Sequence, residues 1–154
     1  MSQLHVEAEA TSRAEPEAVW ALVSDATRYP EFGPWSAGGY RRPGQESERG
    51  PGAVQWVRSS HRAYLRYATS VEKILVAEEG RRLAYTVIGG IPVRNYRAEV
   101  TLTPVAGGTH IRWAATWDNT MAGRIVGRSL RTIFPAAVAG LAAAAERQSG
   151  NPAS

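Results

Sequence analysis

The stretch "YRAEVTLTPVAGGTHIRWAATWDN", from Tyr96 to Asn119, decides most of what the sequence predicts about the fold. Polar and apolar residues alternate along both of its halves, and Gly107 and Gly108 separate the halves. Such alternation is typical of half-buried strands, and a short glycine-rich link is typical of a hairpin turn. The stretch therefore predicts two antiparallel strands with one buried face.

The predicted buried face of this hairpin is large and aromatic. Successive side chains of a strand point to opposite faces, so Arg97, Glu99 and Arg112 fall on the solvent side. This face is either an ordinary sheet core or the wall of a small-molecule cavity, and both interpretations stay open. The inward set is Arg94, Tyr96, Ala98, Val100 and Leu102 in the first strand, and Ile111, Trp113, Ala115 and Trp117 in the second.

Further strands precede the hairpin along the chain. "LHVEAEA" (Leu4–Ala10) alternates in the same way, and three later segments also read as strands: "AVQWVRSS", "AYLRYATSVEKILVAEE" and "RRLAYTVIGG". Clusters of Gly, Pro and charged residues separate these segments at hairpin spacing. The stretch from Ala37 to Gly52 is expected to hold one more strand and a loose turn. The chain therefore predicts about seven antiparallel strands.

Helical patterns occupy the remaining segments. A short helix is expected from about Glu15 to Ser24, with Pro16 in its first turn, and a second from Asp25 through "ATRYPEF". The segment "MAGRIVGRSLRTIFPAAVAGLAAAAERQ" has the helical period, with apolar residues on one face and arginines on another. Pro135 is predicted to kink or divide this last helix, because proline lacks the N–H that a helix interior uses.

The order of these elements predicts an α+β fold. A strongly curved antiparallel sheet of about seven strands is expected to wrap on the long C-terminal helix, with two short helices after the first strand. Residues 1–148 are expected to form a single domain, and the polar residues 149–154 a disordered tail.

Composition excludes several classes of function. The chain has no cysteine, so disulfides, thiolate catalysis and cysteine-based metal sites are excluded. No run approaches the roughly 18 apolar residues of a membrane span, and the first residues lack the pattern of a signal peptide, so we expect a cytoplasmic protein without stable membrane insertion. The net charge is +4, but the arginines are scattered, which argues against nucleic acid as a partner.

Four segments together resemble a known family. They are "VWALVSDATRYPEFGPWS" (Val19–Ser36), "GPGAV" (Gly50–Val54), "GRRLAYTV" (Gly80–Val87) and "VTLTPVAGGTHIRW" (Val100–Trp113). Their order and spacing resemble the helix-grip fold of the START-like superfamily, also called SRPBCC, and within it the bacterial polyketide cyclase/dehydrase-like members. The resemblance implies a cavity between the sheet and the long helix that holds an apolar ligand.

The side chains expected to line this cavity are mainly aromatic. Tyr29, Phe32 and Trp35 are expected to form a lid over one end, and Trp56 with Arg58 the mouth. Arg94 either points into the cavity or reaches solvent at the end of its strand. The full predicted lining is Tyr29, Phe32, Trp35, Trp56, Tyr67, Tyr85, Arg94, Tyr96, Trp113, Trp117, Ile133 and Phe134.

Neither a hydrolytic centre nor a metal site is predicted. Ser60 and His61 are neighbours on a strand segment, and neighbours on a strand point to opposite faces, so they do not form a nucleophile–base pair. His5, His61 and His110 fall on separate strands without the spacing of metal ligands. We expect neither a metal nor a cofactor.

The carboxylates do not yield a catalytic residue either. Four of them alternate onto the apparent outer face, so no acid–base pair is assigned: Glu7, Glu9, Glu72 and Glu99. The resemblance implies an interior arginine in the cyclases of the family. At the corresponding strand this chain has Tyr67, Thr69, Val71 and Glu72 instead.

Three functions follow as hypotheses. The first is binding of a small hydrophobic or aromatic ligand, such as a polyketide-, lipid- or quinone-like molecule. The second is an aromatase/cyclase or dehydratase that positions a reactive chain and stabilises an enolate. The third is a structural or partner-binding domain with a collapsed cavity. The protein is expected to be a monomer or a homodimer.

Overall fold

The computed structural model describes residues 2–60 and 68–150. Within them one antiparallel sheet has seven strands in the order β1-β7-β6-β5-β4-β3-β2. Consecutive strands from β2 to β7 therefore pair with one another, and β1 pairs with β7. The strands are β1 (Gln3–Ser12), β2 (Trp35–Arg42), β3 (Val54–Ser59), β4 (Thr69–Glu78), β5 (Arg82–Gly89), β6 (Arg97–Val105) and β7 (Gly108–Asp118).

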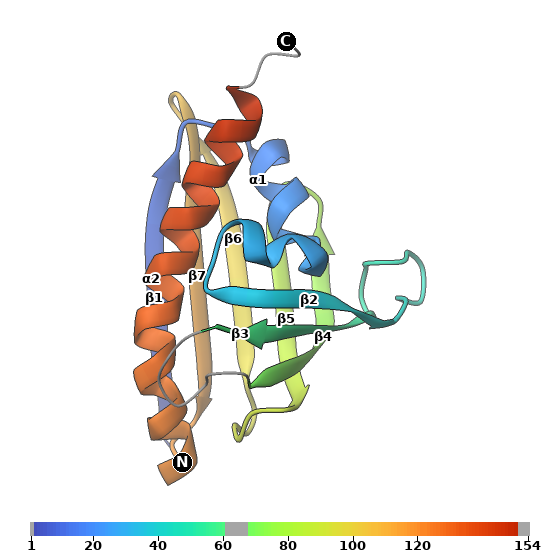
Figure 1. The fold of residues 1–154 in the computed structure, drawn as a ribbon, viewed down its shortest axis with the longest axis vertical. Helices are drawn as coiled ribbons and strands as arrows, with labels where there is room; N and C mark the ends of the chain where they lie inside the picture. The colour runs from blue at the N-terminus through green and yellow to red at the C-terminus, as the bar shows by residue number, and fades with distance from the viewer. Residues whose placement is uncertain (1, 61–67, 151–154) are drawn as a thin grey trace.

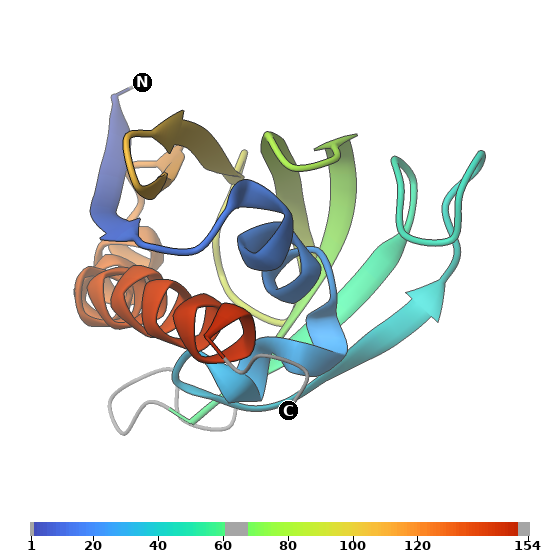
Figure 2. The same cartoon turned by 90° about the horizontal axis from the view of Figure 1, so that it is seen from above.

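The sheet is strongly twisted and covered on one face. In Figure 1, β1 and β7 run along the long axis of the molecule, whereas β2 and β3 run across it. The long helix α2 (Met121–Ser149) lies over β1 and β7, and Figure 2 shows the sheet curving around it. This arrangement confirms the predicted α+β helix-grip fold.

The two short helices close one end of the curved sheet. Pro16 begins α1 (Pro16–Val23), where its missing N–H has no intrahelical partner to lose. The Asp25 side chain caps η1 (Ala26–Glu31), a 3₁₀-helix, by accepting a hydrogen bond from the Thr27 amide at 3.0 Å. A Cβ on Gly140 of α2 would collide with the Phe32 carbonyl, so a glycine lets the long helix approach the end of η1 closely.

The last helix departs from two expectations: Pro135 does not divide it, and it is longer and more apolar than expected. The helix is continuous through Pro135, which lies on its exposed side, where water can hydrate the carbonyl that proline leaves unpaired. The segment is also long and apolar enough to cross a membrane by length and composition, contrary to the expectation from the sequence. More than half of its most apolar window is buried inside the fold, as in the core helix of a globular domain.

The predicted hairpin formed as expected. Trp113 and Trp117 are fully buried, whereas Arg112 on the outer face forms an ion pair with Glu7 at 3.0 Å. The turn between β6 and β7 contains Gly107 with φ = 80°, a conformation that glycine adopts without strain. Alternation along β6 and β7 therefore separates the core from the solvent face.

Candidate ligand pocket

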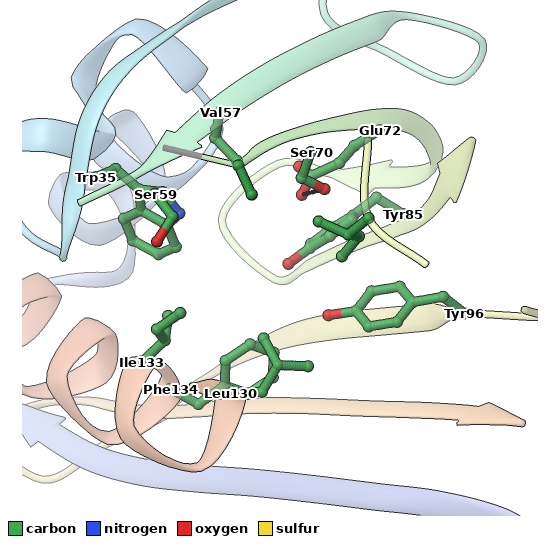
Figure 3. A pocket seen from close by; sticks show the side chains of 12 residues that line it. Trp35, Val57, Ser59, Ser70, Glu72, Tyr85, Tyr96, Leu130, Ile133 and Phe134 are labelled. Atoms are coloured by element: carbon green, nitrogen blue, oxygen red, sulfur yellow. Dashed lines mark hydrogen bonds between the residues drawn. The ribbon is translucent and has the colours of Figure 1, made fainter. Parts of the chain in front are cut away.

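A pocket lies between strands β3, β4 and β5 of the sheet and α2. Its volume is about 40 Å³, which is room for a few water molecules. Strands β3, β4 and β5, the β5–β6 connection and α2 all contribute to it (Figure 3). The lining residues are Trp35, Val57, Ser59, Ala68, Ser70, Glu72, Tyr85, Ile91, Tyr96, Leu130, Ile133 and Phe134.

The pocket has an apolar side and a polar side. Leu130, Ile133 and Phe134 face it from α2, and the apolar period of that helix places all three on one face. Across from them, the hydroxyls of Tyr85 and Tyr96 point toward the middle of the pocket (Figure 3). A lining of this kind can hold an apolar body and orient one oxygen-bearing group.

Glu72 is the acidic group of the polar side, and only 5% of it is exposed. Its carboxylate accepts hydrogen bonds from Gln55 Nε2 at 2.9 Å and from Ser70 Oγ at 3.1 Å. No cationic side chain of the described ranges forms an ion pair with it. Burial raises the pKa of Glu72 to about 7, against the opposing effect of the two hydrogen bonds. The carboxyl group therefore changes charge near neutral pH.

The inward position of Glu72 corrects the expectation that it faces solvent. Glu72 pairs with Gln55 across β3 and β4, and both side chains are buried on the inner face. Irregularities in the pairing of β4 with β5, between Val71 and Glu72 and between Ile74 and Val76, break the alternation that the sequence suggested. One available signal was Ile74, a buried apolar residue two positions after Glu72 and therefore on the same face.

Tyr85 is held by the predicted hairpin. Trp113 Nε1 donates a hydrogen bond to the Tyr85 hydroxyl at 3.1 Å, and the Tyr85 hydroxyl in turn interacts with the hydroxyl of Tyr96. Tyr85 keeps one proton to donate, either to Tyr96 or to a bound ligand. Ala98 of β6 pairs with both Tyr85 and Ala115, so two small side chains lie next to Tyr85 across the neighbouring strands. Burial, followed by the neighbouring Tyr96 and Glu72, raises the pKa of Tyr85 well above its ordinary value.

Tyr96 lies beside Tyr85 and is also a proton donor. Their ring centroids are 6.3 Å apart. Burial first, and then the charge of Glu72, raises the pKa of Tyr96 far above its ordinary value. Both tyrosines therefore keep their protons across the physiological pH range.

Aromatic rings fill the space beside the pocket. Tyr29, Phe32 and Trp35 contact one another, and Trp35 stacks on Trp113 with centroids 5.8 Å apart and an interplanar angle of 26°. Phe134 contacts Trp113 at 5.7 Å. Trp35 is only partly buried, whereas the other four residues are buried. Trp35 is therefore the cluster member with access to both the pocket and the surface.

The Tyr29 hydroxyl is a buried polar group of this aromatic cluster, and among the described residues it has no hydrogen bond of good geometry. The Gln55 amide interacts with it and lowers its pKa slightly. Burial dominates, however, and raises the pKa of Tyr29 well above its ordinary value, followed by the charge of Glu72. Tyr29 is therefore a neutral phenol.

The structure brings only part of the predicted lining into the pocket. Five of the predicted residues line it: Trp35, Tyr85, Tyr96, Ile133 and Phe134. Four more are buried around it as core: Tyr29, Phe32, Trp113 and Trp117. Tyr67, like His61, lies outside the described residues. Sequence reasoning missed the polar positions Ser59, Ser70 and Glu72, along with Gln55 behind them.

Two predicted lining residues lie elsewhere. Trp56 is on the outer face of β3, since its neighbours Gln55 and Val57 are the buried ones, and the Arg58 guanidinium lies 5.8 Å from its ring centroid. Arg94 is exposed before β6 begins. The following Asn95 has φ = 53°, a left-handed conformation that interrupts the strand, so alternation cannot be extended back to Arg94.

The described residues also contain no cluster of three or more His, Asp or Glu side chains that could hold a metal ion. The chemistry that the pocket offers is therefore a carboxyl group, phenolic hydroxyls and serine hydroxyls against an apolar wall.

Comparison with known proteins places the chain in a family. The family model described as polyketide cyclase/dehydrase and lipid transport matches residues 3–146. The chain belongs to this family. This confirms the resemblance to the START-like superfamily that four sequence segments indicated.

Solved structures support the same fold. The aromatase/cyclase ZhuI from a Streptomyces species superposes with a TM-score of 0.79 at 16% identity, over 96% of each chain. The protein TTHA0849 from Thermus thermophilus gives a TM-score of 0.73 at 17% identity, over 95% of this chain and 99% of that one. No curated protein sequence matches this chain significantly. At such identities the likeness concerns the fold alone.

Proposed function

We propose that this protein binds a small, mainly apolar ligand carrying a carbonyl or hydroxyl group in the pocket between the sheet and α2. The observation that supports this proposal is the division of the pocket into two sides. Apolar residues of α2 face a polar side that contains Glu72, Tyr85 and Tyr96. An ordinary core would satisfy or avoid such polar groups instead of exposing them to a cavity. Membership of a family named for polyketide cyclases and lipid transport is consistent with such a ligand.

The size of the pocket adds a condition. A volume of about 40 Å³ is far below the roughly 300–1,000 Å³ of typical ligand pockets. A ligand with an aromatic ring therefore has to displace a side chain, and Trp35 is the partly exposed member of the aromatic cluster. The small volume also favours the alternative of a structural domain with a collapsed cavity.

Binding of matched compounds tests this proposal. The probes are 2-naphthol, 2-tetralone and tetralin, which share a bicyclic skeleton while tetralin lacks the oxygen. Tryptophan fluorescence and thermal shift measure the affinity. We expect both oxygenated compounds to bind about fivefold more tightly than tetralin, because one hydrogen bond contributes about 1 kcal/mol.

A filled-pocket variant completes this test. Ile133→Trp should remove the binding of 2-naphthol by occupying the pocket, whereas the exposed Arg128→Ala on the same helix should leave it unchanged. If neither oxygenated compound binds, or if Ile133→Trp binds them like the unmodified protein, the collapsed-cavity alternative is favoured.

A further inference from the structure

The position of Glu72 is unfavourable for stability and needs another reason. An ionised carboxylate has about four lone-pair sites, and the two protein hydrogen bonds leave others available. A buried charge without a cationic partner destabilises the fold. The group nevertheless lines a cavity between the sheet and α2, where a ligand atom can reach it.

The two tyrosines supply the complementary groups. The Tyr85 hydroxyl accepts a hydrogen bond from Trp113, which fixes its orientation and polarises its remaining O–H bond. Tyr96 points into the same pocket beside it (Figure 3). All three side chains line the same small pocket, and the charge of Glu72 acts on both hydroxyls.

A base beside hydrogen-bond donors is the arrangement that converts a ketone to its enol. The donors stabilise the charge that develops on the carbonyl oxygen, and the base accepts the proton from the neighbouring carbon. We propose that Glu72 is a catalytic base for proton transfer at the carbon next to a ketone, with Tyr85 and Tyr96 holding the carbonyl oxygen. This inference rests on the proposed function, because the ketone must enter the same pocket.

The step balances without a further reactant. The Glu72 carboxylate takes the proton, the C–H electron pair becomes a carbon–carbon double bond, and the carbonyl π pair moves to the oxygen that Tyr85 and Tyr96 hold. The resulting Glu72 carboxylic acid returns a proton to carbon, which regenerates the ketone and the base. In heavy water the net result is exchange of hydrogen for deuterium at that carbon.

The surroundings of Glu72 set the pH at which this base works. Because burial raises the pKa of Glu72 to about 7, the carboxylate form gives way to the acid as the pH falls below that value. Among the described residues, the polar groups that face it are neutral, and α2 adds only apolar side chains. These polar groups are Tyr29 from η1, Gln55 from β3, Ser70 from β4, Tyr85 from β5 and Tyr96 from the β5–β6 connection.

Deuterium exchange of 2-tetralone, followed by NMR, tests the assignment. We expect the protein to accelerate the exchange about 100-fold or more over buffer, the usual contribution of a positioned general base. Glu72→Gln should return the rate to that of buffer while 2-naphthol still binds. Tyr85→Phe should slow the exchange about 100-fold, as loss of an oxyanion donor does. The matched control is Glu99→Gln, a carboxylate on the outer face of the same sheet, which should keep the full rate.

The outcomes separate this inference from the proposed function. If 2-tetralone binds but exchanges at the buffer rate, or if folded Glu72→Gln exchanges like the unmodified protein, the assignment is overturned and the binding function stands. If neither 2-tetralone nor 2-naphthol binds, both are overturned.

The pH profile of the unmodified protein gives an independent readout that does not depend on a variant folding. The rate relative to buffer should fall as the pH drops below about 7, where Glu72 is protonated. A relative rate that is flat from pH 5 to 9 contradicts a role for Glu72.

Discussion

The two halves of the concave sheet face are built on opposite principles. On the half formed by β1, β7 and β6, α2 packs against buried apolar side chains, and even the Trp117 indole N–H is satisfied, by the Gly123 carbonyl at 2.9 Å. On the half formed by β3, β4 and β5, the inner face contains Gln55, Ser70 and Glu72, and a pocket remains. The first half gains stability from apolar burial, and the second accepts a buried carboxyl group.

This difference separates the part of the core that apolar packing explains from the part that it does not. Apolar packing needs no ligand to account for it, whereas a buried acid beside a cavity, with no cationic partner among the described residues, does. Trp113 connects the halves, because its ring packs in the aromatic cluster and its N–H binds Tyr85 of the polar half. Substitutions on either side of this boundary test whether the two halves differ in this way.

The largest effect is expected from Trp113→Ala. The ring is fully buried, so its loss should lower the free energy of unfolding by about 3–5 kcal/mol. Urea denaturation followed by circular dichroism measures this change. The control is Trp56→Ala on the outer face, which is only partly buried and should lose clearly less. A loss below about 1.5 kcal/mol for Trp113→Ala would mean that the ring lines an open cavity. Trp113 would then not belong to the apolar core formed by β1, β7 and β6.

The next effect concerns the polar half and depends on pH. The pKa of Glu72 is raised in the folded protein, so the folded state binds more protons than the unfolded state between about pH 4.5 and 7. The contribution of Glu72 to the free energy of unfolding should therefore fall by about 3 kcal/mol as the pH rises through this window, since one pKa unit is about 1.4 kcal/mol. Above pH 7 this contribution should be constant.

Comparison with Glu72→Gln isolates this contribution, because the variant cannot ionise at that position. The difference in free energy of unfolding between the two proteins, measured at pH 5 and at pH 8, should shift by about 2.5 kcal/mol in favour of the variant, since pH 5 already lies inside the window. An unchanged difference would show that Glu72 titrates normally and that the two halves do not differ in this respect.

A smaller effect is expected from two buried serines at the contact between β1 and α2, Ser12 of β1 and Ser129 of α2. Ser12 Oγ donates to the Ala142 carbonyl at 2.8 Å and accepts from the Ala14 amide at 3.2 Å. Ser12→Ala should therefore destabilise the protein by about 1–3 kcal/mol, because it leaves buried polar groups unpaired. Ser129 is also buried, but its hydroxyl has no hydrogen-bond partner among the residues that the structure describes. Ser129→Ala should be neutral or slightly stabilising. Thermal unfolding measures both variants, and equal losses in the two would contradict this account.

The packed half was predictable from the sequence for a physical reason. Alternation runs unbroken through β6 and β7, and one face is fully buried, so the positions of Trp113 and Trp117 follow from counting residues. The apolar period of α2 likewise predicted that Ile133 and Phe134 face the sheet. Local sequence determines both patterns.

The polar half was not predictable in the same way. The pairing of Gln55 with Glu72 joins two strands, and it becomes visible only with the register of β3 and β4. Irregular pairing along β4 also breaks the alternation from which an outward Glu72 was expected. A charged residue suggests solvent on average, but an average preference cannot identify the exception at a site.

The smallest effect is expected from Arg94→Ala, and it tests the boundary of the pocket. Arg94 was a candidate for the cavity, yet it is exposed and is separated from β6 by Asn95 in a left-handed conformation. The substitution should change the free energy of unfolding by less than about 0.5 kcal/mol, as surface substitutions usually do. The affinity for 2-naphthol, measured by fluorescence titration, should stay within twofold of the unmodified protein. A tenfold loss of affinity would place Arg94 in the bound state of the pocket, and it would show that the polar half extends to the β5–β6 connection when a ligand enters.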